Sequence, residues 1–210
     1  WKVNGGAAVK NLTLGATDYT NVISLQATWT ANKYTVTFDK QNGTGGSTSA
    51  AATFNSAMPA ITVPTRMGYT FGGYYTAKNG GGTQYYTSSG ASAKNWNIAA
   101  NTTLYAKWTA KTYTVTFDKQ NGTGGSASVT ATFNGAMPAI TVPTRTGYTF
   151  GGYYTAKNGG GTQYYTASGA SAKNWNITAN TTLYAKWTAN TYTITYNANK
   201  PGRASASIAG

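Results

Sequence analysis

The residues best able to do chemistry in this sequence are tyrosines and lysines set among glycines. The segment FGGYYTAKNGGGTQYY occupies residues 71–86 and returns unchanged at residues 150–165. A flat phenol ring can stack on a sugar ring or a base, and a neighbouring ammonium group can meet an anion. The candidate ligand-binding residues are therefore Tyr74, Tyr75, Lys78, Tyr85, Tyr86 and Lys94, with Tyr153, Tyr154, Lys157, Tyr164, Tyr165 and Lys173 in the second copy.

The same rings also have an interpretation as core residues. A small domain without disulfide bonds depends on its aromatic side chains, each of which can bury roughly 150–250 Å². Neighbouring residues of a strand point to opposite faces, so we expect one ring of each Tyr-Tyr pair to face inward and its neighbour outward. The structural interpretation is favoured for the segment as a whole, and a binding function would depend on the exposed rings.

The side chains that enzymes use for acid–base and nucleophilic chemistry are nearly absent. The sequence has no Cys, His or Glu, and its acids are Asp18, Asp39 and Asp118. General acid–base catalysis usually needs His or a pair of carboxylates, and thiolate or Cys/His metal chemistry needs the residues that are missing. The sequence therefore predicts no enzyme, no catalytic residue, no metal site and no cofactor.

The charge is strongly positive, with 16 Lys and Arg against 3 acids and a net charge of +13. This balance favours polyanionic partners, namely an anionic cell-wall polymer, an anionic polysaccharide, a nucleic acid or an acidic membrane. The basic residues are scattered singly, which is typical of a solvated surface. Without a basic cluster or a known nucleic-acid-binding motif, nucleic acid ranks third among the function classes.

The elements that must position these residues form a tandem array. Residues 34–109 align with residues 113–188, and the two copies differ at seven positions. This period is longer than the usual solenoid unit of about 20–50 residues, so each copy should fold as its own domain. The predicted domains are residues 1–32 (the C-terminal part of a preceding divergent repeat), 33–111 and 112–190 (complete repeats) and 191–210 (the start of a truncated repeat). Because the pattern is cut at both ends, we expect a piece of a longer chain.

Strand signals dominate each repeat. Tyr34, Val36 and Phe38 alternate with threonines, which is the period of a half-buried strand. Pro59 and Pro64 predict an extended crossover in place of a long helix. The predicted core of the first repeat consists of Tyr34, Val36, Phe38, Phe54, Ile61, Tyr69, Phe71, Trp96, Ile98, Leu104 and Trp108.

Two local features accompany the strands. Gly72-Gly73 interrupts the third strand and predicts a β-bulge, and residues 95–98 are expected to form a single helical turn. Asp39 and Asp118 each follow a first strand, where a carboxylate ordinarily accepts hydrogen bonds within a turn.

The combination YTVTFD, PTRTGYTFGGYYT and NTTLYAKW resembles the Listeria–Bacteroides repeat, or internalin B-repeat-like family. The resemblance implies a mainly β fold (α+β at most), with tandem small β-grasp (ubiquitin-like) repeat domains in an elongated array. It further implies a bacterial surface or secreted protein in which the repeats space functional domains. Two departures stand out, namely Gly73-Tyr74-Tyr75 where the family often has Gly-Trp-Tyr, and a lengthened loop containing three glycines.

The expected function is thus a non-catalytic stalk or spacer of a bacterial cell-surface or secreted protein, which projects a functional domain from the wall. Neighbouring repeats of the same chain are its expected partners. The alternative is a binding module for a glycan or an anionic cell-wall polymer that uses exposed Tyr and Lys. No apolar segment approaches the roughly 20 residues that a membrane-spanning helix needs.

Overall fold

The structure is a computed structural model that describes residues 2–3 and 25–196. Contacts within the chain separate two units, Trp1–Ala110 and Lys111–Gly210, and each has its own sheet and core. A short antiparallel pair, β1 (Lys2–Val3) with β2 (Leu25–Gln26), precedes the first large sheet in the chain. Much of the predicted partial repeats, residues 1–32 and 191–210, lies outside the described residues.

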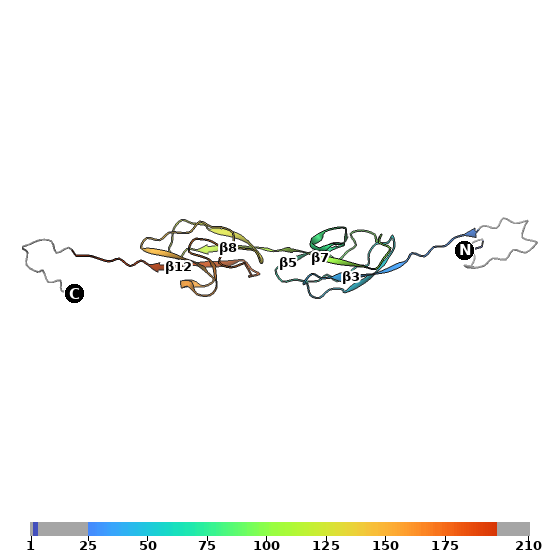
Figure 1. The fold of residues 1–210 in the computed structure, drawn as a ribbon, viewed down its shortest axis with the longest axis horizontal. Helices are drawn as coiled ribbons and strands as arrows, with labels where there is room; N and C mark the ends of the chain where they lie inside the picture. Colours follow the sequence, from blue (N-terminus) through green and yellow to red (C-terminus); the bar gives the residue numbers. More distant parts are fainter. Residues whose placement is uncertain (1, 4–24, 197–210) are drawn as a thin grey trace, which may run out of the picture. The chain divides into compact units, whose positions relative to one another are not determined.

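Each unit is built on a five-stranded mixed sheet of the same topology (Figure 1). Across the first sheet the order is β4 (Ser49–Thr53), β3 (Lys33–Asp39), β7 (Thr102–Ala110), β5 (Tyr69–Tyr75) and β6 (Gln84–Tyr86). Across the second it is β9 (Ser128–Thr132), β8 (Thr112–Asp118), β12 (Thr181–Ala189), β10 (Tyr148–Tyr154) and β11 (Gln163–Tyr165). The prediction of a mainly β fold is confirmed.

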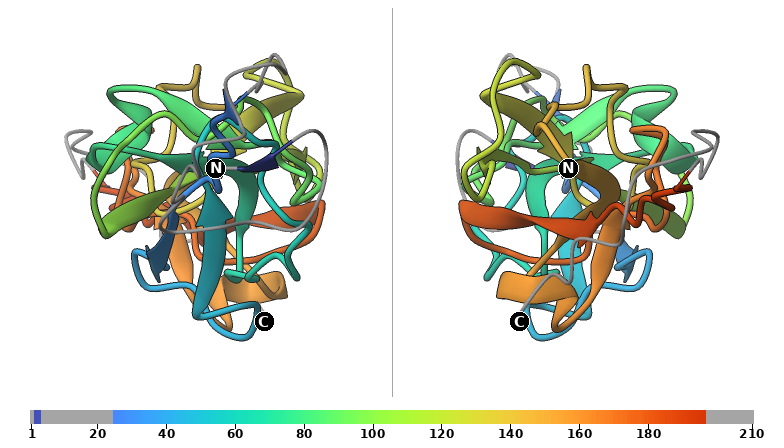
Figure 2. Two further views of the ribbon diagram at one scale, coloured as in Figure 1. Left: turned by 90° about the vertical axis from the view of Figure 1, so that its right-hand side faces the viewer. Right: turned by 90° about the vertical axis from the view of Figure 1, so that its left-hand side faces the viewer.

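The first and last strands of each sheet lie side by side and run parallel. Strand β3 pairs with β7, and β8 pairs with β12, whereas all the other neighbouring strands are antiparallel. The alternation predicted for the first strand is present, because Val36 and Phe38 are buried while the threonines between them are exposed. The strands of each sheet are twisted, as is usual for β-sheets (Figure 2).

The crossover between β4 and β5 is extended, as its two prolines predict. Residues 57–64 contain no helix, and Ser47 N donates to Thr62 O at 2.9 Å while Thr44 bridges to Thr65. Helical structure in the described residues is limited to two 3₁₀ turns, Lys78–Gly80 and Lys157–Gly159. The expected helical turn at residues 95–98 is wrong, because Trp96 N and O bond instead to Ser56 O and Asn55 N across the fold.

The predicted bulge at Gly72-Gly73 is confirmed and decides which rings enter the core. The pairing register of β5 with β7 shifts between Phe71 and Tyr74, and Gly73 has φ 111°. A Cβ at Gly73 would lie 2.2 Å from Tyr86 O, so only glycine fits there. The shift changes the phase of the strand, so Phe71 and Tyr74 both point inward and Tyr75 points outward.

The core of each unit is mainly aromatic and aliphatic. Of the predicted set, Val36, Phe38, Phe71, Trp96 and Leu104 are buried, and the others are half-buried. Six further buried residues of the first unit were not in that set: Ala52, Met58, Tyr74, Tyr85, Tyr86 and Ala106. The tyrosines therefore contribute more to the core than the strand alternation predicts.

Candidate functional site

Three of the four tyrosines in each glycine-rich segment are core residues. Tyr74, Tyr85 and Tyr86 are at most 2% exposed, and Tyr153, Tyr164 and Tyr165 match them in the second unit. Tyr74 stacks on Phe38 with ring centroids 4.5 Å apart. Their rings are enclosed by protein, and in this structure they present no face on which a ligand could stack.

The expectation that one ring of each Tyr-Tyr pair faces outward is wrong for Tyr85 and Tyr86. Strand β6 is only three residues long, and the chain after it folds back so that Ala93 N donates to Tyr85 O at 2.9 Å. Trp96 thereby packs on the Tyr85 ring at 4.8 Å between centroids, and the Tyr85 hydroxyl donates to Asn97 Oδ1. The Tyr86 hydroxyl donates to Pro59 O at 3.0 Å. Both faces of the short strand are therefore covered.

Burial keeps these phenols neutral. It raises the pKa of Tyr74 to about 12, with a further contribution from the negative charge of Asp39, and it raises the pKa of Tyr86 to about 12. Tyr153 and Tyr165 behave in the same way. The Tyr74 hydroxyl is also buried without a hydrogen-bond partner among the described residues. Groups in this state cannot serve as general bases near neutral pH.

Asp39 stabilises a turn, as its position at the end of β3 predicts. Its Oδ1 accepts a hydrogen bond from Gln41 N at 2.9 Å, and that bond lowers the pKa of the carboxyl group, with Lys78 adding a smaller effect. Asp118 and Gln120 repeat the arrangement. Within the described residues no group of three His, Cys, Asp or Glu side chains could hold a metal ion.

The fourth tyrosine of each segment takes part in an aromatic and basic surface. Tyr75 lies directly opposite Tyr105 across β5 and β7, and Lys107 Nζ is 5.7 Å from the Tyr75 ring centroid. Lys78 Nζ is 5.9 Å from the Tyr105 centroid. We call these four residues, with Tyr154, Lys157, Tyr184 and Lys186 in the second unit, the tyrosine–lysine face.

The backbone beneath Lys107 explains why its side chain is held over the sheet. Lys107 lies over Gly72 and Gly80, and a Cβ at Gly80 would come within 2.6 Å of Lys107 Cδ. Two of the glycines in the segment thus make room for a lysine stem. A stem fixed in this way loses little further freedom if its ammonium group binds an anion.

The predicted binding residues therefore divide into three groups. Tyr75 and Lys78, with Tyr154 and Lys157, belong to the tyrosine–lysine face. Lys94 and Lys173 are exposed on loops, and neither lies over an aromatic ring of the described residues. The remaining tyrosines are buried. Tyr105 and Lys107 were missed as site residues, although the inward alternation of Leu104, Ala106 and Trp108 places both on the outer surface.

Sheet order, repeat and surface together define a class of small, mainly β repeat units. Residues 34–107 and 113–186 each match the model of the Listeria-Bacteroides repeat domain, and the chain belongs to this family. The resemblance found in the sequence is confirmed.

Curated relatives support the same assignment. Internalin H of Listeria monocytogenes serovar 1/2a (strain EGD-e) is 35% identical over 163 residues, which cover 75% of this chain and 25% of the relative. Two proteins of Evansella cellulosilytica, named "Putative Gly-rich membrane protein" and "Putative membrane protein", are each 28% identical, covering 83% and 84% of this chain and 18% and 24% of their own lengths. The chain thus spans a quarter or less of each relative. No solved structure matches.

Proposed function

We propose that the chain is a set of non-catalytic structural repeats that space other domains of a bacterial cell-surface or secreted protein. The observation that carries this proposal is the placement of the tyrosines, because six of the eight in the two glycine-rich segments are buried in the cores. The aromatic residues that recur in both copies thereby have a structural role. The names of the curated relatives, an internalin and two membrane proteins, support a location at the cell surface.

Each unit is, in this proposal, a β-grasp domain without its helix. The sheet order supports this, with the first and last strands parallel at the centre and a hairpin on either side. The proline-containing crossover at residues 57–64 takes the place that a helix would occupy between the second and third strands. In the described residues no helix is long and apolar enough to cross a membrane.

The connection between the units also favours a spacer. Strand β7 ends at Ala110 and β8 begins at Thr112, so a single residue separates the last strand of one unit from the first strand of the next. A connection this short allows much less freedom than a linker of several residues. We therefore propose that successive repeats keep a narrow range of separations.

A distance measurement tests the spacer. The chain has no cysteine, so Ser88→Cys and Ala167→Cys, at equivalent exposed positions, allow two spin labels to be attached. Pulsed electron–electron double resonance then measures the distance between the labels. We expect a narrow distance distribution. The matched control has six Gly/Ser residues inserted after Ala110 and should give a broad one. If the original chain is as broad as the control, the repeats do not act as a spacer.

A second candidate function is binding of an anionic polymer by the tyrosine–lysine face. The observation in its favour is the recurrence of two tyrosines and two lysines on both units. Neutralising Lys107 and Lys186 by substitution with Gln should weaken binding to immobilised poly(glycerol phosphate). The control, Lys94→Gln with Lys173→Gln, removes exposed lysines outside the face. Equal losses of affinity in both variants would mean that binding depends on net charge alone and not on the tyrosine–lysine face.

A further inference from the structure

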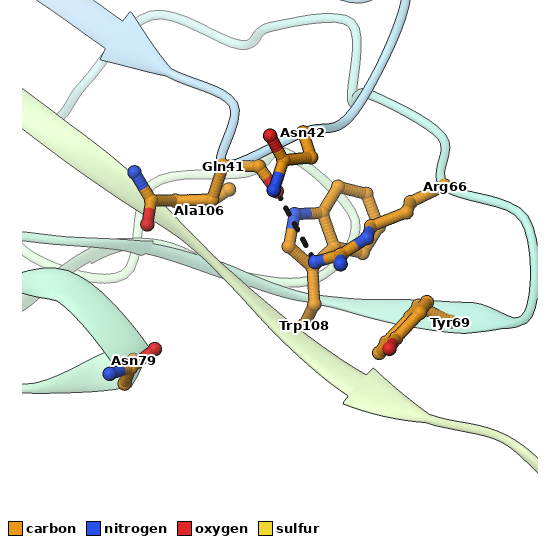
Figure 3. Close-up of a pocket in the computed structure, with 7 residues that line it drawn as sticks. All are labelled: Gln41, Asn42, Arg66, Tyr69, Asn79, Ala106 and Trp108. Carbon is orange, nitrogen blue, oxygen red and sulfur yellow. Dashed lines mark hydrogen bonds between the residues drawn. The ribbon is translucent and has the colours of Figure 1, made fainter. Parts of the chain in front are cut away.

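In the first unit a hollow lies beside the turn that follows the first strand (Figure 3), and a hollow in the second unit shares three of its side chains. In the first unit it measures about 310 Å³ and is lined mainly by Gln41, Asn42, Arg66, Tyr69, Asn79 and Trp108. The second unit has a hollow of about 420 Å³ that includes the equivalent arginine, tyrosine and tryptophan, Arg145, Tyr148 and Trp187. We call each hollow, with its arginine, tyrosine and tryptophan, the arginine cleft. None of these residues belongs to the tyrosine–lysine face.

The indole of the arginine cleft is fixed by the fold. Trp108 Nε1 donates to Lys40 O at 2.9 Å, and the ring packs 5.4 Å from that of Phe71. A Cβ at Gly43 would lie 2.6 Å from Trp108 Cζ2, so the turn leaves room for this ring and for little else. Trp187 makes the same bond to Lys119 O at 2.8 Å. The wall of the cleft is therefore formed before any ligand arrives.

The guanidinium group is also held in place. Arg66 Cζ lies 4.0 Å from the Tyr69 ring centroid, and Nη1 donates to Gln41 O at 3.3 Å. In the second unit Arg145 lies 3.8 Å from the Tyr148 ring and makes the same bond to Gln120 O at 3.3 Å. Figure 3 shows the Arg66 side chain reaching toward Trp108 and Gln41 over the hollow.

Among the residues that the structure describes, no carboxylate neutralises the positive charge of the arginine cleft. A guanidinium group has five N–H donors, and in the described part of the chain one of those of Arg66 has a hydrogen-bond partner. No acidic residue among the described residues lines either hollow. Asp39, the acidic residue within residues 25–110, accepts its hydrogen bond from Gln41 N in the turn. The cleft therefore offers a positioned cation with unused donors.

We propose that the arginine cleft binds the carboxylate of an acidic sugar residue within a polysaccharide. The planar fork of the arginine matches the two oxygens of a carboxylate. Beside it, in the first unit, the exposed amides of Asn42 and Asn79 can donate to and accept from sugar hydroxyl groups, whereas threonines line the hollow of the second unit; in both, the indole offers an apolar surface for the ring. A site that combines these three chemistries fits a sugar acid better than a plain inorganic anion.

Repetition adds to this recognition. Each unit carries one cleft, so a polysaccharide with acidic sugars at intervals could occupy both clefts at once. Simultaneous binding raises the overall affinity well above that of a single site, provided that the polymer spans the separation. This function goes beyond spacing and does not depend on it.

Nuclear magnetic resonance of the indole N–H groups locates binding directly. The probe is a tetrasaccharide of galacturonic acid, compared with the same tetrasaccharide after reduction of its carboxylates to alcohols. We expect the acid to shift the indole signals of Trp108 and Trp187, while the buried Trp96 and Trp175 stay unchanged, and the reduced sugar to cause no shift. Absence of shifts at Trp108 and Trp187, or equal shifts with the reduced sugar, would overturn the proposal.

Calorimetry with two charge variants separates specific recognition from net charge. Arg66→Lys with Arg145→Lys keeps the charge but loses the fork, and we expect it to weaken binding of the acidic tetrasaccharide by about tenfold. Lys94→Gln with Lys173→Gln removes the same number of charges outside both the cleft and the tyrosine–lysine face, and it should change the affinity by less than about twofold at physiological salt. The opposite ranking would refute a site at the arginine.

Two further measurements complete the test. The thermal midpoints of the lysine-for-arginine variant and the wild-type chain should agree within a few degrees, and the indole spectrum shows directly whether the variant is folded. An oligomer of glycerol phosphate serves as a phosphate probe with the wild-type chain. If it shifts Trp108 and Trp187 as strongly as the acidic sugar does, the assignment of a carboxylate is wrong.

Discussion

The buried hydroxyl of Tyr74 permits a sharp test of how the core is stabilised. This hydroxyl has no hydrogen-bond partner among the described residues, whereas the hydroxyl of Tyr86, in the same core, donates to Pro59 O at 3.0 Å. Both side chains are 0% exposed. Replacing each by Phe removes the same oxygen atom from two buried environments, one in which it is hydrogen-bonded and one in which it is not.

The expected effects have opposite signs. A buried hydroxyl without a partner costs about 1–3 kcal/mol of unfolding free energy, so Tyr74→Phe should raise the stability by about 1 kcal/mol. Tyr86→Phe loses a hydrogen bond worth about 1 kcal/mol. The two variants should therefore differ by about 2 kcal/mol.

The assay is urea unfolding of the whole chain followed by tryptophan fluorescence. Because the units are nearly identical, each substitution is made in both, as Tyr74→Phe with Tyr153→Phe and as Tyr86→Phe with Tyr165→Phe. For a domain of this size 1 kcal/mol corresponds to a midpoint shift of about 1 M urea. If the Tyr74 variant is destabilised as much as the Tyr86 variant, the hydroxyl has a stabilising partner and the reasoning fails.

Three further predictions concern the same units. First, the pKa of Tyr74 and Tyr86 is about 12 in the folded state, against 10.0 for the ordinary group, so the folded state holds these protons more tightly. The resulting contribution to stability is present below pH 10 and is lost between pH 10 and 12, by roughly 2 kcal/mol per ring. Urea midpoints should therefore fall steeply across that range, and a flat profile would contradict the burial of these hydroxyl groups. Second, Gly73→Ala should lower the unfolding free energy by more than about 3 kcal/mol, because its Cβ would meet Tyr86 O at 2.2 Å. Gly45→Ala should lower it by only about 1 kcal/mol, because Gly45 has φ 64° and a Cβ there would meet nothing within 4 Å. Similar thermal midpoints for the two variants would disprove the close approach at Gly73. Third, the pKa of Asp39 is lowered in the folded state, so its carboxylate stabilises the fold above the unfolded pKa and this contribution is lost as the pH falls. Asp39→Asn with Asp118→Asn should therefore make the stability depend less on pH on the acid side. An unchanged acid slope would show that the hydrogen bond to Asp39 in the turn does not stabilise the fold.

Local patterns predicted the local features of the fold. The alternation at Val36 and Phe38, the extended crossover between Pro59 and Pro64, the bulge at Gly73 and the turn at Asp39 each depend on a few neighbouring residues, and each is present. Such features follow from backbone sterics and side-chain period alone.

The placement of the tyrosines depends on contacts that local patterns do not contain. The bulge at Gly73 moves Tyr74 to the inner face, but its one-residue shift can be counted only once the partner strand β7 is known. Tyr85 is covered by Trp96, which lies 11 residues further along a loop with no periodic signal. The arginine cleft was missed because Arg66 was recognised as part of a family motif and not as a charge without a carboxylate partner.

The parallel pairing of β3 with β7 has a mechanical consequence. Val36 to Asp39 pair with Thr102 to Tyr105 in a parallel register, so tension applied through the entry to β3 and the exit from β7 loads these bonds in shear, all at once. Bonds arranged in this way must break together, unlike those of a hairpin, which unzip one at a time. We expect each unit to resist extension until a high rupture force, and single-molecule stretching that found gradual yielding at low force would show that the central strands do not share the load.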